Sequence, residues 1–453
     1  MTVLWAERAL LPEGWAENIR VTLSPEGRIA EVTPDAAPEG QRFGLLLPAM
    51  ANLHSHAFQR AMAGLSEAKG PEPRDTFWTW RQIMYRFLDH LTPEDVEAIA
   101  ALVQMEMLEA GYATNVEFHY LHHQPGGAHY DNIGEMSARI AAAAARTGIG
   151  LTLLPVHYQF GGCDRRGLGA GQVRFGTTPE DFARLLDSAE AAIRGLPDAG
   201  IGVAPHSLRA VSPEGLAFCA ALRPDRPIHL HLAEQVPEIE EVSAAYGLRP
   251  VEWVLENCAP DARWTFIHLT HMTEDETRRL ARTGAVAGLC PITESSLGDG
   301  IFNGTVWAAE KGRLGFGSDS NIRISLTEEL RTLEYSQRLR DRARAIYATR
   351  EGSTGRVIYD AGLDGGRTAA GRETGAIAPG LWADLCAVDV DNPVMAGRGG
   401  DEMLDSLIFA GHDGLVRDVW SGGRHVVREG RHMDHDRITG DYIACIRRLQ
   451  ERM

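Results

Sequence analysis

Two histidines that stand two residues apart give the clearest chemical signal in the sequence. The segment ANLHSHAFQR places His54 and His56 where an apolar, strand-like stretch ends. Side chains at positions i and i+2 of a strand point to the same side, so the two imidazoles can bind one metal ion together. Such a pair can also cap a turn or fill a core, and on its own it leaves both interpretations open.

Three later segments add residues that suit a metal-dependent hydrolase. HLHLAEQ contains His231 and Glu234, TFIHLTHM contains His268, and GFGSDSN contains Asp319. Imidazoles and carboxylates bind Zn²⁺, and a free carboxylate beside the metal can carry protons. Taken singly, Glu234 fits an acid at a helix N-terminus and Asp319 fits a helix cap. As an ordered set, these residues predict a metal centre, whereas His229 is expected to pack within its strand.

These residues need a scaffold that brings the ends of several strands together, and the middle of the chain offers one. Strands are expected over residues 45–53, 114–119, 150–157, 201–206, 227–231, 263–268, 285–289 and 315–319. Helices are expected between them, including 93–110, 132–147, 179–194, 237–246 and 273–283. Eight strands that alternate with helices predict an α/β fold of the (β/α)₈ TIM-type barrel class. An open doubly wound sheet is the alternative, but no glycine-rich nucleotide-binding segment follows an early strand.

Polar residues recur where the expected strands end, which is the face that carries the chemistry of barrel enzymes. The residues are His54, His56, His119, Tyr120, His157, His206, His231, His268 and Asp319. Random placement of the 17 histidines would not favour one end of so many strands, so the pattern supports a single site at that face.

The two ends of the chain differ from the middle. Residues 1–46 and 377–435 alternate apolar and polar positions between turns marked by glycine and proline. Neither segment is a convincing core alone, so we expect one composite β-sandwich domain built from both. A catalytic barrel over 47–376 and a C-terminal helix over 436–453 complete the expected organisation.

The composition narrows the class of partner. The 453 residues carry a formal net charge of −17, which disfavours nucleic acid. No apolar run of about 18 residues and no N-terminal secretion signal is visible, so neither a membrane span nor export is expected. The six cysteines are scattered, which suits a reducing cytoplasm. We therefore expect a cytoplasmic protein that acts on a small molecule.

The ordered set resembles the amidohydrolase superfamily, within it the amidine and cyclic-amidine deaminases. The resemblance covers nearly the whole chain and rests on LLPAMANLHSH, IHLTHM, CPITESSLGDGIF, GAIAPGLWADLCAVD and VWSGGRHVVREGR. It implies four metal ligands, namely His54, His56, His231 and Asp319. It also implies that His268 orients the attacking water, that Asp319 helps to deprotonate it, and that Glu234 shuttles protons.

The same resemblance implies one metal ion per chain. Relatives with two metals carry a carboxylated lysine or a glutamate near the end of the fourth strand, and LLPVHYQF and GVAPHSLR offer neither. Three histidines and an aspartate suit zinc, with iron and manganese as alternatives.

Five polar residues near the expected pocket bear on the substrate: Gln59, Arg81, Tyr120, His206 and Arg209. Guanidinium groups bind carboxylates in a bidentate manner, so two arginines favour a dicarboxylate. An isolated arginine more often forms a surface ion pair, and the loop that carries Arg81 has no readable geometry.

Longer segments resemble one family, the N-formimino-L-glutamate deiminases of bacterial histidine degradation. They are NLHSHAFQRAMAGL, TFWTWRQIMY, EFHYLHH, APHSLRAVS, HLHLAEQ, PITESSLGDGIF and GSDSNIRISLTEELR. The resemblance implies hydrolysis of N-formimino-L-glutamate to N-formyl-L-glutamate and ammonia, by a homodimer. The alternative is a deaminase of a ring amidine such as guanine, which would have no obvious need for paired arginines. A third hypothesis is a metal-binding scaffold without catalysis, against which Glu234 and Asp319 argue.

Overall fold

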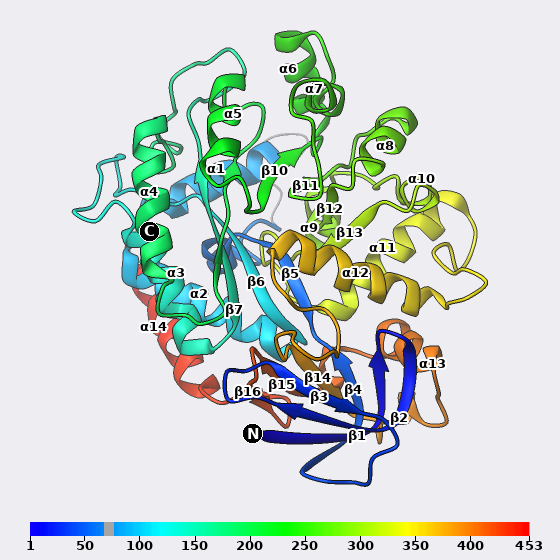
Figure 1. The fold of residues 1–453 in the computed structure, drawn as a ribbon. Helices are drawn as coiled ribbons and strands as arrows, with labels where there is room; N and C mark the ends of the chain where they lie inside the picture. The colour runs from blue at the N-terminus through cyan, green and yellow to red at the C-terminus, as the bar shows by residue number, and fades with distance from the viewer. Residues whose placement is uncertain (68–76, 453) are drawn as a thin grey trace.

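Eight strand positions form a closed parallel barrel in the computed structural model, which describes residues 1–67 and 77–452, with the backbone alone at 77–79 (Figure 1). The strands are β5 (Met50–Ser55), β6 (Tyr112–His119), β7 (Gly150–His157), β8 (Gly200–Ile201) with β9 (Ala204–Pro205), β10 (Ile228–Leu232), β11 (Trp264–His268), β12 (Val286–Leu289) and β13 (Arg313–Phe316). Bridges between Val203 and Ile228 and between Ser55 and Asp319 join the two parallel sheets. The predicted (β/α)₈ barrel is confirmed.

The fourth strand position is divided, although the sequence predicts one strand there. At Gly202 a Cβ atom would lie 2.5 Å from Leu154 and 2.7 Å from the Pro227 carbonyl oxygen, so the neighbouring strands leave no room for a side chain. Pairing resumes at β9, after which the His206 N–H donates to the His157 carbonyl, 3.1 Å away. The break therefore still delivers His206 to the C-terminal face.

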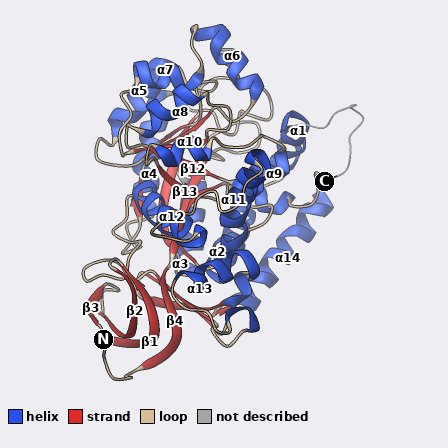
Figure 2. Ribbon diagram, turned by 90° about the vertical axis from the view of Figure 1, so that its right-hand side faces the viewer, coloured by secondary structure: helices blue, strands red, loops and turns tan. Residues whose placement is uncertain are grey.

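Helices cover the outside of the barrel, as Figure 2 shows. They are α1 (Phe77–Leu88), α2 (Pro93–Glu109), α3 (Glu135–Thr147), α4 (Pro179–Ala192), α5 (Pro213–Leu222), α6 (Val236–Tyr246), α7 (Pro250–Asn257), α8 (Glu274–Ala281), α9 (Pro291–Leu297), α10 (Gly304–Ala309), α11 (Leu326–Asp341) and α12 (Thr354–Ala370). Thr92, Thr178 and Ser212 accept a backbone N–H at the starts of α2, α4 and α5, and a proline follows each of them. These are common N-terminal signals, and they explain why α2 and α4 were predictable.

A separate sheet uses strands from both ends of the chain. Its order is β17 (Arg431–His432), β16 (Arg424–Arg428), β15 (Val416–Ser421), β14 (Leu385–Val388), β4 (Gln41–Pro48), β1 (Thr2–Leu11), β2 (Gly14–Leu23) and β3 (Ile29–Thr33). The sheet curls over, so that the Ala383 N–H donates to the Gly27 carbonyl, 3.0 Å away. Leu4, Ile19 and Trp420 lie in the core that it encloses. The composite β-sandwich expected from both termini is confirmed.

The predicted strand over residues 45–53 is wrong, because two strands of different sheets occupy this run. β4 pairs with β1 and β14, whereas β5 pairs with β6 in the barrel. Ala49 lies between them and donates its N–H to Asp384, 2.9 Å away. Both strands are buried, so the continuous apolar sequence gives no sign of the change of sheet.

The short helix α13 (Asp401–Asp405) follows β14, and the long C-terminal helix α14 (His435–Arg452) packs against α2. The helix expected over 436–453 thus corresponds to α14 as far as the described residues reach. Whether 1–46 with 377–435, 47–376 and this helix behave as separate domains stays a prediction. Among the described residues, no helix is both long and apolar enough to span a lipid bilayer.

Candidate active site

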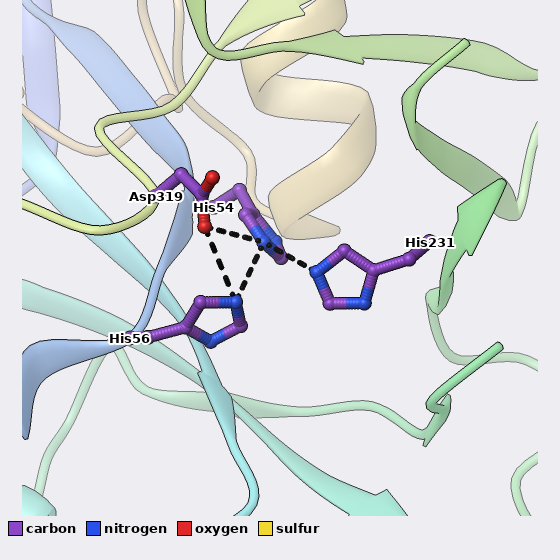
Figure 3. Close-up of side chains that lie close together, drawn as sticks. All are labelled: His54, His56, His231 and Asp319. Atoms are coloured by element: carbon purple, nitrogen blue, oxygen red, sulfur yellow. Dashed lines mark hydrogen bonds and ion pairs between the residues drawn. The ribbon is translucent and has the colours of Figure 1, made fainter. Parts of the chain in front are cut away.

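Four side chains from different parts of the barrel converge at its C-terminal face (Figure 3). The Nε2 atom of His54 lies 3.2 Å from Nε2 of His56 and 3.1 Å from Nε2 of His231. Asp319 brings Oδ1 to 3.2 Å from His56 Nε2 and 3.5 Å from His54 Nε2. Three nitrogens and one oxygen therefore face a common point, which is the donor set that zinc accepts.

In His56 and His231, the hydrogen bond made by Nδ1 determines whether Nε2 carries a proton. Nδ1 of His56 lies 2.9 Å from the Phe118 carbonyl, and Nδ1 of His231 lies 3.1 Å from the His206 carbonyl. A carbonyl only accepts, so each Nδ1 carries the proton and each Nε2 presents a lone pair to the centre. Burial lowers the pKa of both rings, and of His54, which keeps them neutral. Lone pairs this close repel one another, so the residues fit a bound cation.

The segment that carries Asp319 approaches β5 very closely. The Asp319 N–H donates to the His54 carbonyl, and the His56 N–H donates to the Asp319 carbonyl, both at 2.9 Å. A Cβ atom at Gly317 would lie 2.7 Å from His54, so only glycine fits there. Asp319 itself has φ 46°, a left-handed conformation that few non-glycine residues adopt. The close approach of residues 317–319 to β5 thus places one carboxylate beside the histidines.

His268 and Glu234 stand beside this group. Nε2 of His268 lies 3.8 Å from Glu234 Oε1 and 3.8 Å from Asp319 Oδ2. Burial raises the pKa of Glu234, although the charges of His268 and Arg209 oppose the rise. Burial alone would lower the pKa of His268, but Glu234, Glu294 and Asp319 outweigh it and raise that pKa well above its ordinary value. A raised pKa favours the protonated form of each side chain, so Glu234 and His268 can each hold a proton beside the four converging side chains.

One pocket among the described residues opens onto His56, His231, Glu234, His268 and Asp319. All five residues predicted for the substrate line it, namely Gln59, Arg81, Tyr120, His206 and Arg209. Arg81, on α1, donates to the Tyr158 hydroxyl at 2.9 Å, and Gln59 donates to the Tyr120 hydroxyl at 2.6 Å. The pocket wall is thus cationic at two positions and polar around them.

Sequence reasoning missed part of the pocket lining. The missed residues are Trp80, Met84, Tyr158, Phe175, Leu297 and Ser320. Tyr158 lies one residue beyond His157, which was expected at this face but instead meets Thr177 at 2.8 Å, outside the pocket lining. His119 likewise lies outside the lining, whereas its neighbour Tyr120 belongs to it. The expected structural role of His229 fits its contact with the Ala369 carbonyl, 2.9 Å away.

Comparisons with known proteins agree with this geometry. The model of the Amidohydrolase family matches residues 45–426, and that of the Formimidoylglutamate deiminase HutF, N-terminal domain, matches residues 1–42. A formimidoylglutamate deiminase of Pseudomonas aeruginosa is 48% identical over 453 residues, which cover 99% of this chain and 100% of the relative. An 8-oxoguanine deaminase of the same organism is 27% identical over 425 residues, which cover 89% and 88%.

A solved structure shows the same architecture. The crystal structure of an amidohydrolase from Brucella melitensis is 46% identical, with a TM-score of 0.95 over 99% of this chain and 100% of that one. The identity to the Pseudomonas deiminase and the Amidohydrolase family match run through the sandwich and the barrel alike, and the HutF match lies in the sandwich. The chain therefore belongs to the amidohydrolase family, among the formimidoylglutamate deiminases.

Proposed function

We propose that the protein hydrolyses N-formimino-L-glutamate to N-formyl-L-glutamate and ammonia. The observation that carries this proposal is the presence of Arg81 and Arg209 in the pocket that opens onto the histidine–aspartate group. Two guanidinium groups suit a substrate with two carboxylates, and the reacting carbon would then face the metal centre. The 48% identical relative bears the name of this activity.

Amidohydrolases are metal-dependent, and we assign one ion to His54, His56, His231 and Asp319, whose donor atoms all lie within 4.8 Å of one another. A divalent metal held there would acidify a water molecule and polarise the substrate. Zinc suits three imidazoles and a carboxylate, and elemental analysis of the purified protein separates it from iron and manganese.

The proton steps fall to the chain's own residues. Oδ2 of Asp319 and Nε2 of His268 lie 3.8 Å apart, and there His268 would orient the water and help Asp319 to remove its proton as the water oxygen bonds to the formimino carbon. Glu234 would carry both protons of the water to the imino nitrogen, the first after attack and the second as the carbon–nitrogen bond breaks, so that ammonia leaves and the formyl group remains. Arg81 and Arg209 would hold the carboxylates. Gln59, Tyr120 and His206 would position the rest.

We expect the purified protein to release ammonia from N-formimino-L-glutamate and to leave guanine, adenosine and hydantoin-type rings almost untouched. Flexible dicarboxylates can engage both arginines, whereas a neutral ring offers these two guanidinium groups no carboxylate to bind. The measurement is kcat/KM for each compound in one coupled ammonia assay. Turnover of a ring amidine without turnover of the formimino acid would replace this proposal with the ring-deaminase alternative.

Replacing Arg209 by alanine should lower kcat/KM for N-formimino-L-glutamate by about 10- to 150-fold. A hydrogen bond to a charged group contributes about 1.5–3 kcal/mol, and each 1.4 kcal/mol is about tenfold. The matched control is Arg165→Ala, since Arg165 is half-exposed and pairs with Glu214 outside the pocket lining. Equal kinetics for both variants would show that Arg209 holds no carboxylate.

A homodimer in the cytoplasm forms the remaining part of the proposal. The dimer rests on the family resemblance, and sedimentation equilibrium measures it directly. The compartment is supported by the six cysteines, which are all free thiols and mostly buried.

A further inference from the structure

We infer that Glu294 is a positioning residue that fixes His268 at the proposed active site. Glu294 lies on α9 and is 6% exposed, and its Oε1 atom lies 3.2 Å from Nδ1 of His268. The opposite ring nitrogen, Nε2, faces Glu234 and Asp319. Glu294 is not part of the pocket lining. Its carboxylate therefore holds the side of the ring that points away from the reacting atoms.

The backbone at His268 has an unfavourable conformation, which a fixed side chain helps to maintain. His268 has φ 75° and Leu269 has φ 54°, both in the left-handed region that non-glycine residues seldom adopt. Conformations of this kind are unfavourable for residues with a side chain and persist only where the surroundings enforce them. β11 ends at His268, and beyond it the Leu269 N–H still donates to the Leu232 carbonyl, 3.0 Å away. On the face of the ring, His231 stacks at 5.6 Å, and at its edge stands Glu294.

The contact between Glu294 and His268 also determines which ring nitrogen of His268 faces the water at the proposed active site. An ionised carboxylate only accepts hydrogen bonds, so Nδ1 of His268 keeps its proton toward Glu294 and Nε2 is the nitrogen that serves the water. Without Glu294 the ring could turn or carry its proton on the other nitrogen. Glu294 thus acts on the reaction through His268 alone, and this inference rests on the proposed function.

Two other roles compete for the same residue. Oε1 of Glu294 also accepts the N–H of Cys290, 2.9 Å away, where α9 begins, so Glu294 could serve only as a helix cap. His268, Cys290 and Glu294 also bring possible metal donors within 4.8 Å of one another. Burial raises the pKa of the Cys290 thiol well above its ordinary value, and a protonated thiol is a poor ligand. Positioning accounts for both short contacts: the Cys290 N–H holds the Glu294 carboxylate in place, and that carboxylate in turn holds Nδ1 of His268.

The test is a double-mutant cycle on Glu294 and His268, with steady-state kinetics on N-formimino-L-glutamate. Glu294→Ala should lower kcat by about 10- to 100-fold, the usual cost of losing a partner that orients a working histidine, with KM within about threefold. Glu294→Gln keeps an acceptor oxygen for Nδ1 and should recover most of the loss. In the His268→Ala background, Glu294→Ala should change kcat by less than about threefold, because its effect passes through the missing ring.

The matched control is Cys290→Ala, which keeps the backbone N–H that Glu294 accepts and should leave kcat and metal content unchanged. Equal slowing by Glu294→Ala with and without His268 would overturn the inference in favour of a helix cap. Loss of a second equivalent of metal from Glu294→Ala and Cys290→Ala would overturn it in favour of a metal site. If Glu294→Ala does not fold, Glu294→Asp, which draws the carboxylate back by one methylene, replaces it in the same cycle. A loss of kcat only where His268 is present supports the inference, and an equal loss with and without His268, or no loss, overturns it. No turnover by the unchanged protein would instead refute the proposed function.

Discussion

Replacing Glu234 by glutamine will lower kcat for N-formimino-L-glutamate by about 10³-fold, in the middle of the range of about 10²–10⁴ for a general acid–base group. Glu234 lines the pocket, and its Oε1 atom lies 3.8 Å from His268 Nε2. Burial raises its pKa, so this carboxyl can hold a proton and then release it to the departing nitrogen. Glutamine has the same shape but cannot exchange that proton. KM and bound metal should therefore change little.

The control for this variant lies on the following helix. Glu240 is an exposed acid on α6, and Glu240→Gln removes the same charge without touching the pocket. Its kcat should equal that of the unchanged protein. A loss below about tenfold in Glu234→Gln would mean that another group delivers the proton, and His268 would then be the residue to change next.

The convergence of the four proposed metal ligands was predictable because each of them is marked by a local sequence pattern. His54 and His56 share one side of a strand through their i, i+2 spacing, and His231 and Asp319 each stand where a strand ends. Once the alternation of strands and helices indicates a barrel, the C-terminal ends of those strands must come together. The fold class and the site therefore followed from the same pattern of strand ends.

The pocket wall was harder to predict because it depends on tertiary structure. A shift of one residue along a strand turns a side chain to the opposite face, and that is why Tyr158 rather than His157 reaches the pocket. Trp80 and Met84 join Arg81 there because the segment forms a helix, α1, whereas the sequence predicts only a long loop after the first strand. Trp80 and Met84 are four residues apart, a spacing that places two side chains on one face of a helix, and this pattern could have indicated α1.

Removing one proposed metal ligand should have the largest effect of all. His231→Ala deletes one of four donors, and we expect the metal content to fall from about one ion per chain to near zero after dialysis. Loss of Lewis-acid activation is worth several kcal/mol, and each 1.36 kcal/mol is tenfold, so kcat should fall by about 10⁴-fold. Metal content by elemental analysis and ammonia release are measured on the same samples.

The chain supplies a matched control two residues earlier on the same strand. His229 is also buried in β10, but its Nε2 contacts the Ala369 carbonyl, 2.9 Å away, and it is not part of the pocket lining. His229→Gln keeps a donor for that carbonyl and should retain both metal and activity, whatever it costs in thermal stability. If instead His229→Gln loses the metal while His231→Ala keeps it, the assignment of His231 is wrong. Since both variants alter a buried histidine of one strand, the difference between them separates metal binding from folding.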